Sequence, residues 1–289
     1  MNKVWCNGRL TKADDPAVAV LDRGLRFGFG LFETLLCLDG QPVAWNQHIA
    51  RMETSAARFG MAMPNAGELR TGLDELLEAE ALRTGTSRVR IALTGGTGGL
   101  DLEPGHDGVS WIEASAFSPP SEPASIALCP WTRNERDPLA GHKCSAYAGN
   151  LVALDWAKRH DLDEPLFANN RGELCEGATT NVFFVLDGVV RTPMVSTGCL
   201  PGVTRAVVLE LGRTRGVPME EGEFASGLIS QATEVFLTSS LRGIQPVARC
   251  GARDLPAPGT LTKRLMDAYR EWLERPRTNA LSLPGHPGL

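Results

Sequence analysis

A proline-rich stretch in the first half of the chain constrains the possible folds most strongly. The segment FSPPSEPAS has three prolines in nine residues and little apolar surface to bury, which is typical of a linker between domains. At 289 residues, the chain is long enough for two domains. We therefore predict an N-terminal domain over residues 1–118, a linker over 119–124 and a C-terminal domain over 125–276. The tail over 277–289 is polar, rich in Gly and Pro, and expected to be poorly ordered.

Both halves of the chain show mixed helix and strand patterns. Before the linker, LFETLLCLDG predicts a strand running into a turn, and WNQHIARMETSAARFG predicts an amphipathic helix whose apolar residues recur every three or four positions. A second helix is expected over GELRTGLDELLEAEAL and a strand over SRVRIALTG. After the linker, strands are expected over SIALCPW, PLFANN, NVFFVLDGVVRTP, TEVFLTSS and QPVARC, with helices near residues 147–159, 203–215 and 262–275. The pattern predicts an α+β protein.

Composition excludes several classes of function. The formal net charge is −5, and no basic stripe of the kind that binds nucleic acid is present. No apolar run approaches the roughly 20 residues that span a bilayer, and the N-terminus MNKVWCNGRL lacks the apolar core of a signal peptide. The seven cysteines form no CxxC pair and the histidines show no metal-ligand spacing, so neither disulfides nor a metal site is predicted. We expect a cytoplasmic protein with small-molecule partners, and neither nucleic-acid nor membrane partners.

Three short segments have residues that suit chemistry, although each also has an ordinary structural interpretation. In GELCEGATTNVFF, Glu176 ends a short strand before a run of small residues, which places its carboxylate at a crowded turn. In LPGVTRAVV, a glycine precedes a helix that begins with Val203 and Thr204, and the N–H groups at a helix N-terminus attract anions. In EVFLTSSLRG, a strand runs into Ser239 and Ser240, whose hydroxyls suit a phosphate. Taken singly, these patterns are equally typical of a hairpin turn, a helix cap and a serine turn.

Lysine is scarce in this chain, which narrows the choice of a reactive amine. Only Lys3, Lys12, Lys143, Lys158 and Lys263 occur. Lys158 lies at a basic helix end that should face solvent. Lys143, in AGHKCSAYAGN, precedes the helix expected near residue 147 and has the most enclosed setting, although a surface loop would also explain it. Because Schiff-base chemistry requires a lysine amine, Lys143 is the candidate for it.

The order of these segments resembles that in one enzyme family. DRGLRFGFGLFETL at residues 22–35, HIAR, the Lys143 segment, CEGATTNVF, LPGVTR and FLTSSLRGIQPV follow one another as in the fold type IV pyridoxal-phosphate enzymes, or class IV aminotransferases. This family contains branched-chain and D-amino acid aminotransferases, (R)-amine transaminases and aminodeoxychorismate lyase. The resemblance covers residues 4–250 and implies a smaller N-terminal α/β domain and a larger C-terminal α/β pseudo-barrel domain, with pyridoxal 5'-phosphate between them. It also implies a homodimer.

The resemblance assigns roles to the matching positions. Lys143 would hold pyridoxal phosphate as a Schiff base and act as general acid and base, and Glu176 would pair with the pyridine nitrogen. A carboxylate there keeps the nitrogen protonated and makes the ring an electron sink. Arg51 in HIAR matches the phosphate-binding arginine, whose guanidinium suits bidentate contacts. Tyr147 would hydrogen-bond the ring hydroxyl, and the remaining phosphate-binding positions are Val203, Thr204 and Ser240, with Ser239 close by.

Several positions depart from the family's pattern. Where relatives carry arginines that grip the substrate carboxylate, in a loop resembling TRGTGPRG, this chain reads TGGTGGLDL and has Gly95 and Leu100. Phe29 stands where the family commonly has a small polar or acidic residue, and Ser239 stands where the lyases often carry asparagine. These changes concern the substrate and leave the cofactor positions intact.

The sequence leaves two reactions open. A class IV aminotransferase would transfer an amino group from an amino acid or amine to an oxo-acid, and the missing arginines would fit a substrate whose carboxylate is held elsewhere or is absent. The alternative is 4-amino-4-deoxychorismate lyase, which releases pyruvate and p-aminobenzoate, and the FGFGLFETL and GIQPV segments favour it. A non-catalytic family member is the remoter alternative, and the joint presence of Lys143, Glu176 and Arg51 argues against it. We expect an aminotransferase.

Overall fold

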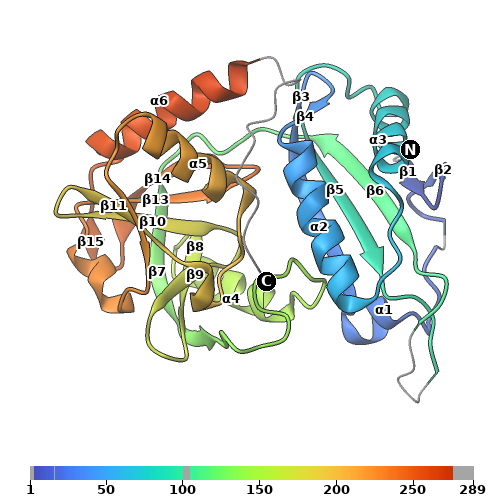
Figure 1. Ribbon diagram of the computed structural model, residues 1–289, viewed down its shortest axis with the longest axis horizontal. Coiled ribbons are helices and arrows are strands. Elements are labelled where there is room, and N and C mark those ends of the chain that lie inside the picture. Colours follow the sequence, from blue (N-terminus) through green and yellow to red (C-terminus); the bar gives the residue numbers. More distant parts are fainter. Residues whose placement is uncertain (1–2, 16, 100–104, 276–289) are drawn as a thin grey trace. The chain divides into compact units, whose positions relative to one another are not determined.

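The chain divides into two compact units (Figure 1). The computed structural model describes residues 3–15, 17–99 and 105–275. Unit 1 comprises Met1–Pro119 and His142–Tyr147, and unit 2 comprises Pro120–Gly141 and Ala148–Leu289. The chain therefore leaves unit 2 for one short segment and then returns to it.

Unit 1 is built on an antiparallel sheet of six strands. Their order across the sheet is β2 (Arg9–Lys12), β1 (Lys3–Cys6), β6 (Ser110–Ala116), β5 (Thr86–Thr94), β3 (Gly30–Leu38) and β4 (Gln41–Pro42). Helices α2 (Trp45–Phe59) and α3 (Ala66–Ala79) pack against this sheet, as Figure 1 shows. A short helix, α1 (Arg23–Phe27), is capped by the Asp22 side chain and leads into β3.

Helical spacing of apolar residues explains why α2 and α3 cover the sheet. Their buried side chains meet the core-facing residues of β3, β5 and β6 in one cluster. This cluster includes Leu31, Leu35, Ile49, Met52, Leu69, Leu73, Leu76, Val89, Ile91 and Ile112. Because side chains alternate along a strand, Phe32 and Thr34 point away from this core. Glu33 lies on the core-facing side of β3 and is buried, although it is a carboxylate.

Unit 2 is built on a curled, mixed sheet of nine strands. The order is β12 (Met219–Gly222), β11 (Val189–Pro193), β10 (Asn181–Leu186), β13 (Glu234–Ser239), β14 (Gly243–Cys250), β7 (Ala124–Arg133), β8 (Glu164–Asn169) and β9 (Leu174–Gly177), with β15 (Arg253–Asp254) paired to β14. Helices α5 (Val203–Thr214) and α6 (Thr260–Glu274) pack against β13 and β14, and α4 (Ala148–Arg159) packs against β7 and β8. Two 3-10 helices, η1 (Val195–Thr197) and η2 (Ser226–Gln231), lie in the connections.

The central strands of unit 2 are apolar on both faces. In β10, Phe183 and Val185 enter the core shared with α5 and α6, whereas Val182 and Phe184 enter a second core. Phe183 stacks on Phe236 with ring centroids 4.8 Å apart. A strand that is covered on both faces has a continuous apolar run, and the sequence NVFFVL has this character.

The predicted fold class is confirmed, and most of the predicted elements are present. The helices expected near residues 147–159, 203–215 and 262–275 correspond to α4, α5 and α6, and the strands expected after the linker correspond to β7, β8, β10, β11, β13 and β14. The helix expected over GELRTGLDELLEAEAL ends at Ala79, and the chain turns at Ala81, whose φ is 56°. Among the described helices, none has the length and hydropathy of a membrane span. The predicted poorly ordered tail lies outside the described residues.

The segment His142–Tyr147 belongs to unit 1, whereas the sequence-based division counted it with residues 125–276. Backbone hydrogen bonds hold it along β3: Phe32 N–H donates to the Lys143 carbonyl at 3.0 Å, and Ser145 N–H donates to the Gly30 carbonyl at 2.8 Å. A Cβ on Gly30 would lie 2.6 Å from a backbone oxygen of β5 and 3.0 Å from the Ser145 hydroxyl. Glycine is therefore required where this segment approaches the strand.

Candidate active site

The predicted site residues fall into two groups, one in each unit. Lys143, Arg51 and Tyr147 belong to unit 1. Glu176, Val203, Thr204, Ser239 and Ser240 belong to unit 2. The second group lies at the end of β9, the start of α5 and the end of β13.

The Lys143 ammonium faces two aromatic rings of unit 1. Its Nζ lies 4.4 Å from the centroid of the Phe32 ring and 5.6 Å from that of Tyr147. The two rings meet edge to face, with centroids 5.2 Å apart. The negative face of an aromatic ring attracts an ammonium, so these rings favour one direction for the lysine side chain.

Arg90, which was not among the predicted site residues, is a second cation beside Phe32. Its guanidinium carbon lies 4.0 Å from the centroid of the Phe32 ring. Its Nε lies 3.8 Å from Glu113 Oε1, which is an ion pair too long for a hydrogen bond. Arg90 and Lys143 therefore place two positive charges around one ring, a setting that attracts an anion. The sequence signal was the alternation of Arg88 and Arg90 in the otherwise apolar strand SRVRIALTG.

Glu33 is a buried carboxylate that holds two residues of α2. Arg51 donates to it twice, from Nε to Oε1 at 2.8 Å and from a terminal nitrogen to Oε2 at 2.7 Å. His48 Nδ1 lies 2.7 Å from Oε2 and donates to it, because an ionised carboxylate only accepts. The Glu33 side chain is 1% exposed. This two-point contact sets the direction of the Arg51 guanidinium.

Burial and the two neighbours act in opposite directions on the pKa of Glu33. Burial raises the pKa of this carboxyl, but the charge of Arg51 and the hydrogen bonds from His48 and Arg51 outweigh burial and lower the pKa to about 2. Burial also lowers the pKa of His48, so its ring is neutral near pH 7. Glu33 therefore remains an ionised partner for Arg51 over the physiological range.

We expect Glu33 to make the stability of the protein depend on pH in the acidic range. Its folded-state pKa of about 2 lies below the ordinary value of 4.5, so the unfolded chain binds more protons between these two values. The resulting contribution, on the order of 3 kcal/mol, is complete above the unfolded pKa and is lost as the pH falls toward the folded pKa. Urea unfolding at several pH values should show a wild-type advantage over Glu33→Gln that shrinks between about pH 5 and pH 3.

Glu113→Gln is the matched control for this prediction. Glu113 also pairs with an arginine of unit 1, but its side chain is 53% exposed. The stability of the Glu113→Gln variant should equal that of the wild type across the same pH range, because exposed ion pairs contribute little to stability. A wild-type advantage over Glu33→Gln that stays constant with pH would show that Glu33 is not the titrating group.

In unit 2, Glu176 lies in a polar, partly buried setting at the end of β9. Its Oε2 accepts a hydrogen bond from Leu200 N–H at 2.9 Å. Arg133 Nε lies 3.8 Å from Oε1, an ion pair without a hydrogen bond. The Arg133 guanidinium lies 4.2 Å from the Phe167 ring centroid and donates to Asn150 Oδ1 at 3.1 Å. The carboxylate is therefore oriented from two sides.

Two thiols beside Glu176 stay protonated near neutral pH. Burial raises the pKa of Cys199 to about 11, and the charge of Glu176 adds to this effect. Burial, followed by the charge of Glu176, also raises the pKa of Cys175. Since the thiolate is the nucleophile, neither cysteine is an active nucleophile here. Within the described part of the chain, no group of three or more His, Cys, Asp or Glu residues is arranged to hold a metal ion.

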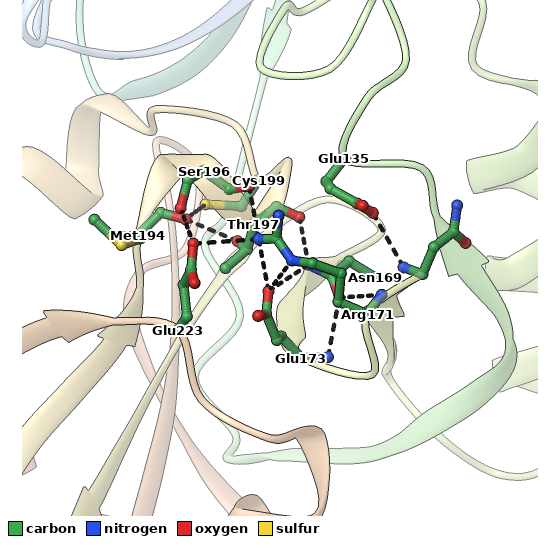
Figure 2. Close-up of polar contacts among 10 residues, drawn as sticks. Glu135, Asn169, Arg171, Glu173, Met194, Ser196, Thr197, Cys199 and Glu223 are labelled. Carbon is green, nitrogen blue, oxygen red and sulfur yellow. Dashed lines mark hydrogen bonds and ion pairs between the residues drawn. The ribbon is translucent and has the colours of Figure 1, made fainter.

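A polar network places the segment that donates to this carboxylate (Figure 2). Asn169, at the end of β8, is buried and donates to Glu173 at 2.7 Å and to the Thr197 carbonyl at 3.3 Å. Arg171 donates to Glu173 at 2.8 Å and to the Ser196 carbonyl at 3.2 Å. These bonds fix η1 to the hairpin of β8 and β9. The backbone N–H that reaches Glu176 follows η1 closely in the chain.

Helix α5 begins at a site with the features of an anion cradle. Its N-cap is Gly202, which has no side chain to cap the first N–H groups. A Cβ on Gly202 would collide with the Asn181 side chain, so the space in front of the helix depends on glycine. Val203 and Thr204 are the first helical residues and lie at the positive end of the helix. Thr238, which pairs with Asn181 across the sheet, has a buried hydroxyl without a hydrogen-bond partner among the described residues.

Ser239 and Ser240 lie at the same end of the sheet as the start of α5. Strand β13 pairs with β10 so that Thr238 faces Asn181, the residue against which Gly202 packs. Ser239 follows directly, and its Oγ accepts a hydrogen bond from Arg242 N–H at 3.2 Å. Uncapped amides, an orphaned hydroxyl and two serines at one end of the sheet form a donor set that fits a phosphate group.

The departure at Gly95 has a steric cause. Gly95 N–H donates to the Phe29 carbonyl at 2.7 Å, and a Cβ at position 95 would lie 2.9 Å from that oxygen and press into the Phe29 ring. An arginine therefore does not fit at position 95 while phenylalanine occupies position 29. Leu100, the other predicted departure in this loop, lies outside the described residues.

Comparison with known proteins gives consistent matches over most of the chain. A sequence model of the family described as Amino-transferase class IV matches residues 30–250, which contain every predicted site residue. A putative branched-chain-amino-acid aminotransferase of Methanocaldococcus jannaschii is 29% identical over 93% of this chain and 96% of its own length. A D-alanine aminotransferase of Listeria innocua is 29% identical over 85% of this chain and 86% of its own. A solved branched-chain aminotransferase from Thermoproteus uzoniensis with norvaline is 27% identical, with a TM-score of 0.85 over 93% of this chain and 94% of that one.

Proposed function

This chain belongs to the amino-transferase class IV family and is a pyridoxal-phosphate-dependent aminotransferase, and on that premise we propose that Lys143 binds the cofactor covalently. The observation that carries the proposal is the placement of the Lys143 amine over the Phe32 ring, in a segment held along β3. When bound, pyridoxal phosphate supplies an aldehyde carbon that reacts with an amine and a ring that withdraws electrons. The Lys143 amine would also act as the general base that moves the proton of the substrate carbon.

The other predicted residues match the differently charged parts of the cofactor. Glu176, oriented by Leu200 N–H, would accept a hydrogen bond from the ring nitrogen and keep it protonated. Arg51, whose direction is set by Glu33, would bind the phosphate. The uncapped start of α5 and the orphaned hydroxyl beside it fit the same group. The remaining contacts would come from Val203, Thr204, Ser239 and Ser240 on the phosphate and from Tyr147 on the ring hydroxyl.

We further propose that the amino donor carries a carboxylate and that Arg90 contacts it. The loop position that holds an arginine in relatives is closed to one here, because Phe29 fills the space beside Gly95. Arg90 instead lies against the ring that Lys143 faces. Its exposed pairing with Glu113 at 3.8 Å is weak enough for a substrate carboxylate to replace it. An amino acid therefore fits this site better than an amine without a carboxylate.

Arg90→Gln is expected to raise KM for an amino acid donor about tenfold, because a charge-assisted bond to the carboxylate is lost. The kinetic constants for a donor without a carboxylate, such as 1-phenylethylamine, should not change. Steady-state kinetics with both donors provide the measurement. Arg88→Gln, on the same strand with its Nε bonded to Ser115, is the matched control and should behave as the wild type. An unchanged KM for every amino acid donor would remove Arg90 from the substrate site.

Visible spectroscopy of the purified protein tests the proposed function. The protein should show an absorption band of bound pyridoxal phosphate that disappears with one class of amino donor and returns with an oxo-acid acceptor. D- and L-amino acids, chiral amines and aminodeoxychorismate are added in turn. A persistent band together with pyruvate released from aminodeoxychorismate would establish the lyase instead. A protein that shows no band after incubation with pyridoxal phosphate would establish the non-catalytic alternative.

We also propose that the protein is a homodimer in the cytoplasm and that it uses an oxo-acid as the amino acceptor. We place its domain boundary at residues 119–124. Membership of the family supports the oxo-acid acceptor and the dimer. Sedimentation of the purified protein tests the dimer: a mass of about twice the chain mass is expected, and a monomer at micromolar concentration would contradict it.

A further inference from the structure

A buried carboxylate in unit 2 joins two turns that adjoin predicted site residues. Glu164, the first residue of β8, is 0% exposed. Its Oε1 accepts hydrogen bonds from Thr179 N–H at 2.5 Å and from the Thr180 hydroxyl at 3.2 Å, in the turn that follows Glu176. Its Oε2 accepts a hydrogen bond from Arg242 at 2.8 Å, in the turn that follows β13. One carboxylate therefore ties the turn between β9 and β10 to the turn between β13 and β14.

Arg242 is held at both its backbone and its guanidinium. Its N–H donates to Ser239 Oγ at 3.2 Å, within the same turn. One terminal nitrogen donates to Gln245 Oε1 at 3.1 Å, and the other, besides reaching Glu164, lies 3.3 Å from the Thr179 hydroxyl. From the turn between β13 and β14, the guanidinium thus bridges Gln245 of β14 and the turn between β9 and β10, and this bridge opposes any movement of Ser239.

Gly177 lets the first turn close on Glu164. Its N–H donates to the Thr180 carbonyl at 2.8 Å, which closes the turn directly after Glu176. A Cβ on Gly177 would lie 2.8 Å from Glu164 Oε1 and would also meet the Thr180 hydroxyl. The glycine is therefore required for the approach of the turn to the carboxylate.

The burial of the Glu164 carboxylate in this ion pair favours a role in geometry over a role in stability. Removing two charges from water costs about as much as their attraction returns, so well-packed apolar side chains often stabilise a fold equally well. The carboxylate oxygens of Glu164 accept hydrogen bonds from Thr179, Thr180 and Arg242. These bonds hold the two turns at a fixed distance from each other. A pair of this kind is suited to hold two parts of a binding site in register.

We propose that Glu164 and Arg242 are positioning residues that set the turn carrying Ser239 and Ser240 relative to Glu176. The inference rests on the proposed function, because it takes these serines as phosphate ligands and Glu176 as the partner of the ring nitrogen. Loss of the bridge then weakens the binding of the phosphate more than the binding of the ring. The pair therefore determines how strongly the protein prefers pyridoxal phosphate to pyridoxal.

The test compares the affinities of pyridoxal phosphate and pyridoxal for the full-length apoprotein, measured by absorbance titration. Arg242→Met is expected to weaken pyridoxal phosphate binding about tenfold and pyridoxal binding less than about twofold. Because Arg242→Met leaves Glu164 buried without a counter-charge, the double variant Glu164→Gln/Arg242→Met is measured as well. The double variant should recover the melting temperature of the wild-type apoprotein and keep the weakened affinity for pyridoxal phosphate.

Arg191→Met is the matched control. Arg191 pairs with Glu220 at 2.7 Å, and its side chain is 17% exposed, compared with 20% for Arg242. It should leave both affinities unchanged. Equal losses for the two ligands, or a pyridoxal phosphate affinity that recovers with the melting temperature in the double variant, would overturn the positioning role. A wild-type protein that binds the two ligands equally and shows no cofactor band would instead overturn the proposed function.

Discussion

Lys143→Ala is expected to abolish covalent attachment of the cofactor and to lower turnover by a factor of about 10³ or more. With the proposed roles of Lys143, the variant would lose both the amine that binds the aldehyde and the base that moves the substrate proton. Pyridoxal phosphate held only by non-covalent contacts should dialyse away from the variant. The visible band before and after dialysis reports whether the cofactor stays attached. Stopped-flow measurement of the reaction with the amino donor reports the rate of turnover.

Lys158→Ala is the matched control for this variant. Lys158 lies in the last turn of α4, at the exposed end of the helix. Its removal should leave cofactor binding and turnover unchanged. A Lys143→Ala protein that keeps its visible band through dialysis and turns over at the wild-type rate would contradict the assignment of the reactive amine.

Glu176→Gln is expected to keep bound cofactor and to lose about 10²-fold or more in the rate of proton removal from the donor. The amide keeps the shape of the side chain and can still accept from Leu200 N–H, which is 2.9 Å from the carboxylate. It lacks the negative charge that keeps the ring nitrogen protonated, so the ring withdraws electrons less strongly. Single-turnover kinetics with an α-deuterated donor should show a larger isotope effect, because proton removal becomes fully rate-limiting.

Glu220→Gln is the matched control for the carboxylate. Glu220 lies on β12, the edge strand of the same nine-stranded sheet, and pairs with Arg191 of β11. It belongs to no predicted site. Its single-turnover rate should equal that of the wild type. A Glu176→Gln protein with an unchanged rate and isotope effect would show that another group supports the ring nitrogen.

The elements of this fold were predictable where one chain segment carries its own pattern. The run NVFFVLDGVVRTP predicts strand structure because apolar residues dominate it, and the structure contains two strands there, β10 and β11, joined by a short turn. The apolar spacing of α2 and α3 likewise reflects the one face that each helix buries. These signals are local, and secondary structure depends strongly on local pattern.

The placement of Lys143 in unit 1 was not predictable from local pattern. Its segment pairs with Gly30 and Phe32, more than a hundred positions earlier in the chain, and no spacing in the sequence reports such a contact. The resemblance to a family is what made Lys143 the candidate for the reactive lysine. Only the fold shows that β3 and the Phe32 ring hold it.

The roles of charged residues inside apolar segments were also not predictable from the sequence. Glu33 stands within GLFETLLCL, where alternation alone suggests one more core position, and its role depends on partners that α2 brings to it. Glu164 and Arg242 meet across 78 positions in a similar way. A buried charge is stabilised by its partners, and partners distant in sequence become visible only in the folded chain.

Borohydride reduction of the purified holoenzyme, followed by peptide mass spectrometry, tests the assignment of Lys143 most directly. Reduction makes the bond between cofactor and lysine permanent, so the modified peptide reports which amine was attached. We predict a phosphopyridoxyl group on the peptide that contains HKCSAYAGN, at Lys143. Modification at Lys158 or another lysine, or no modification of a protein that carries the visible band, would contradict the account.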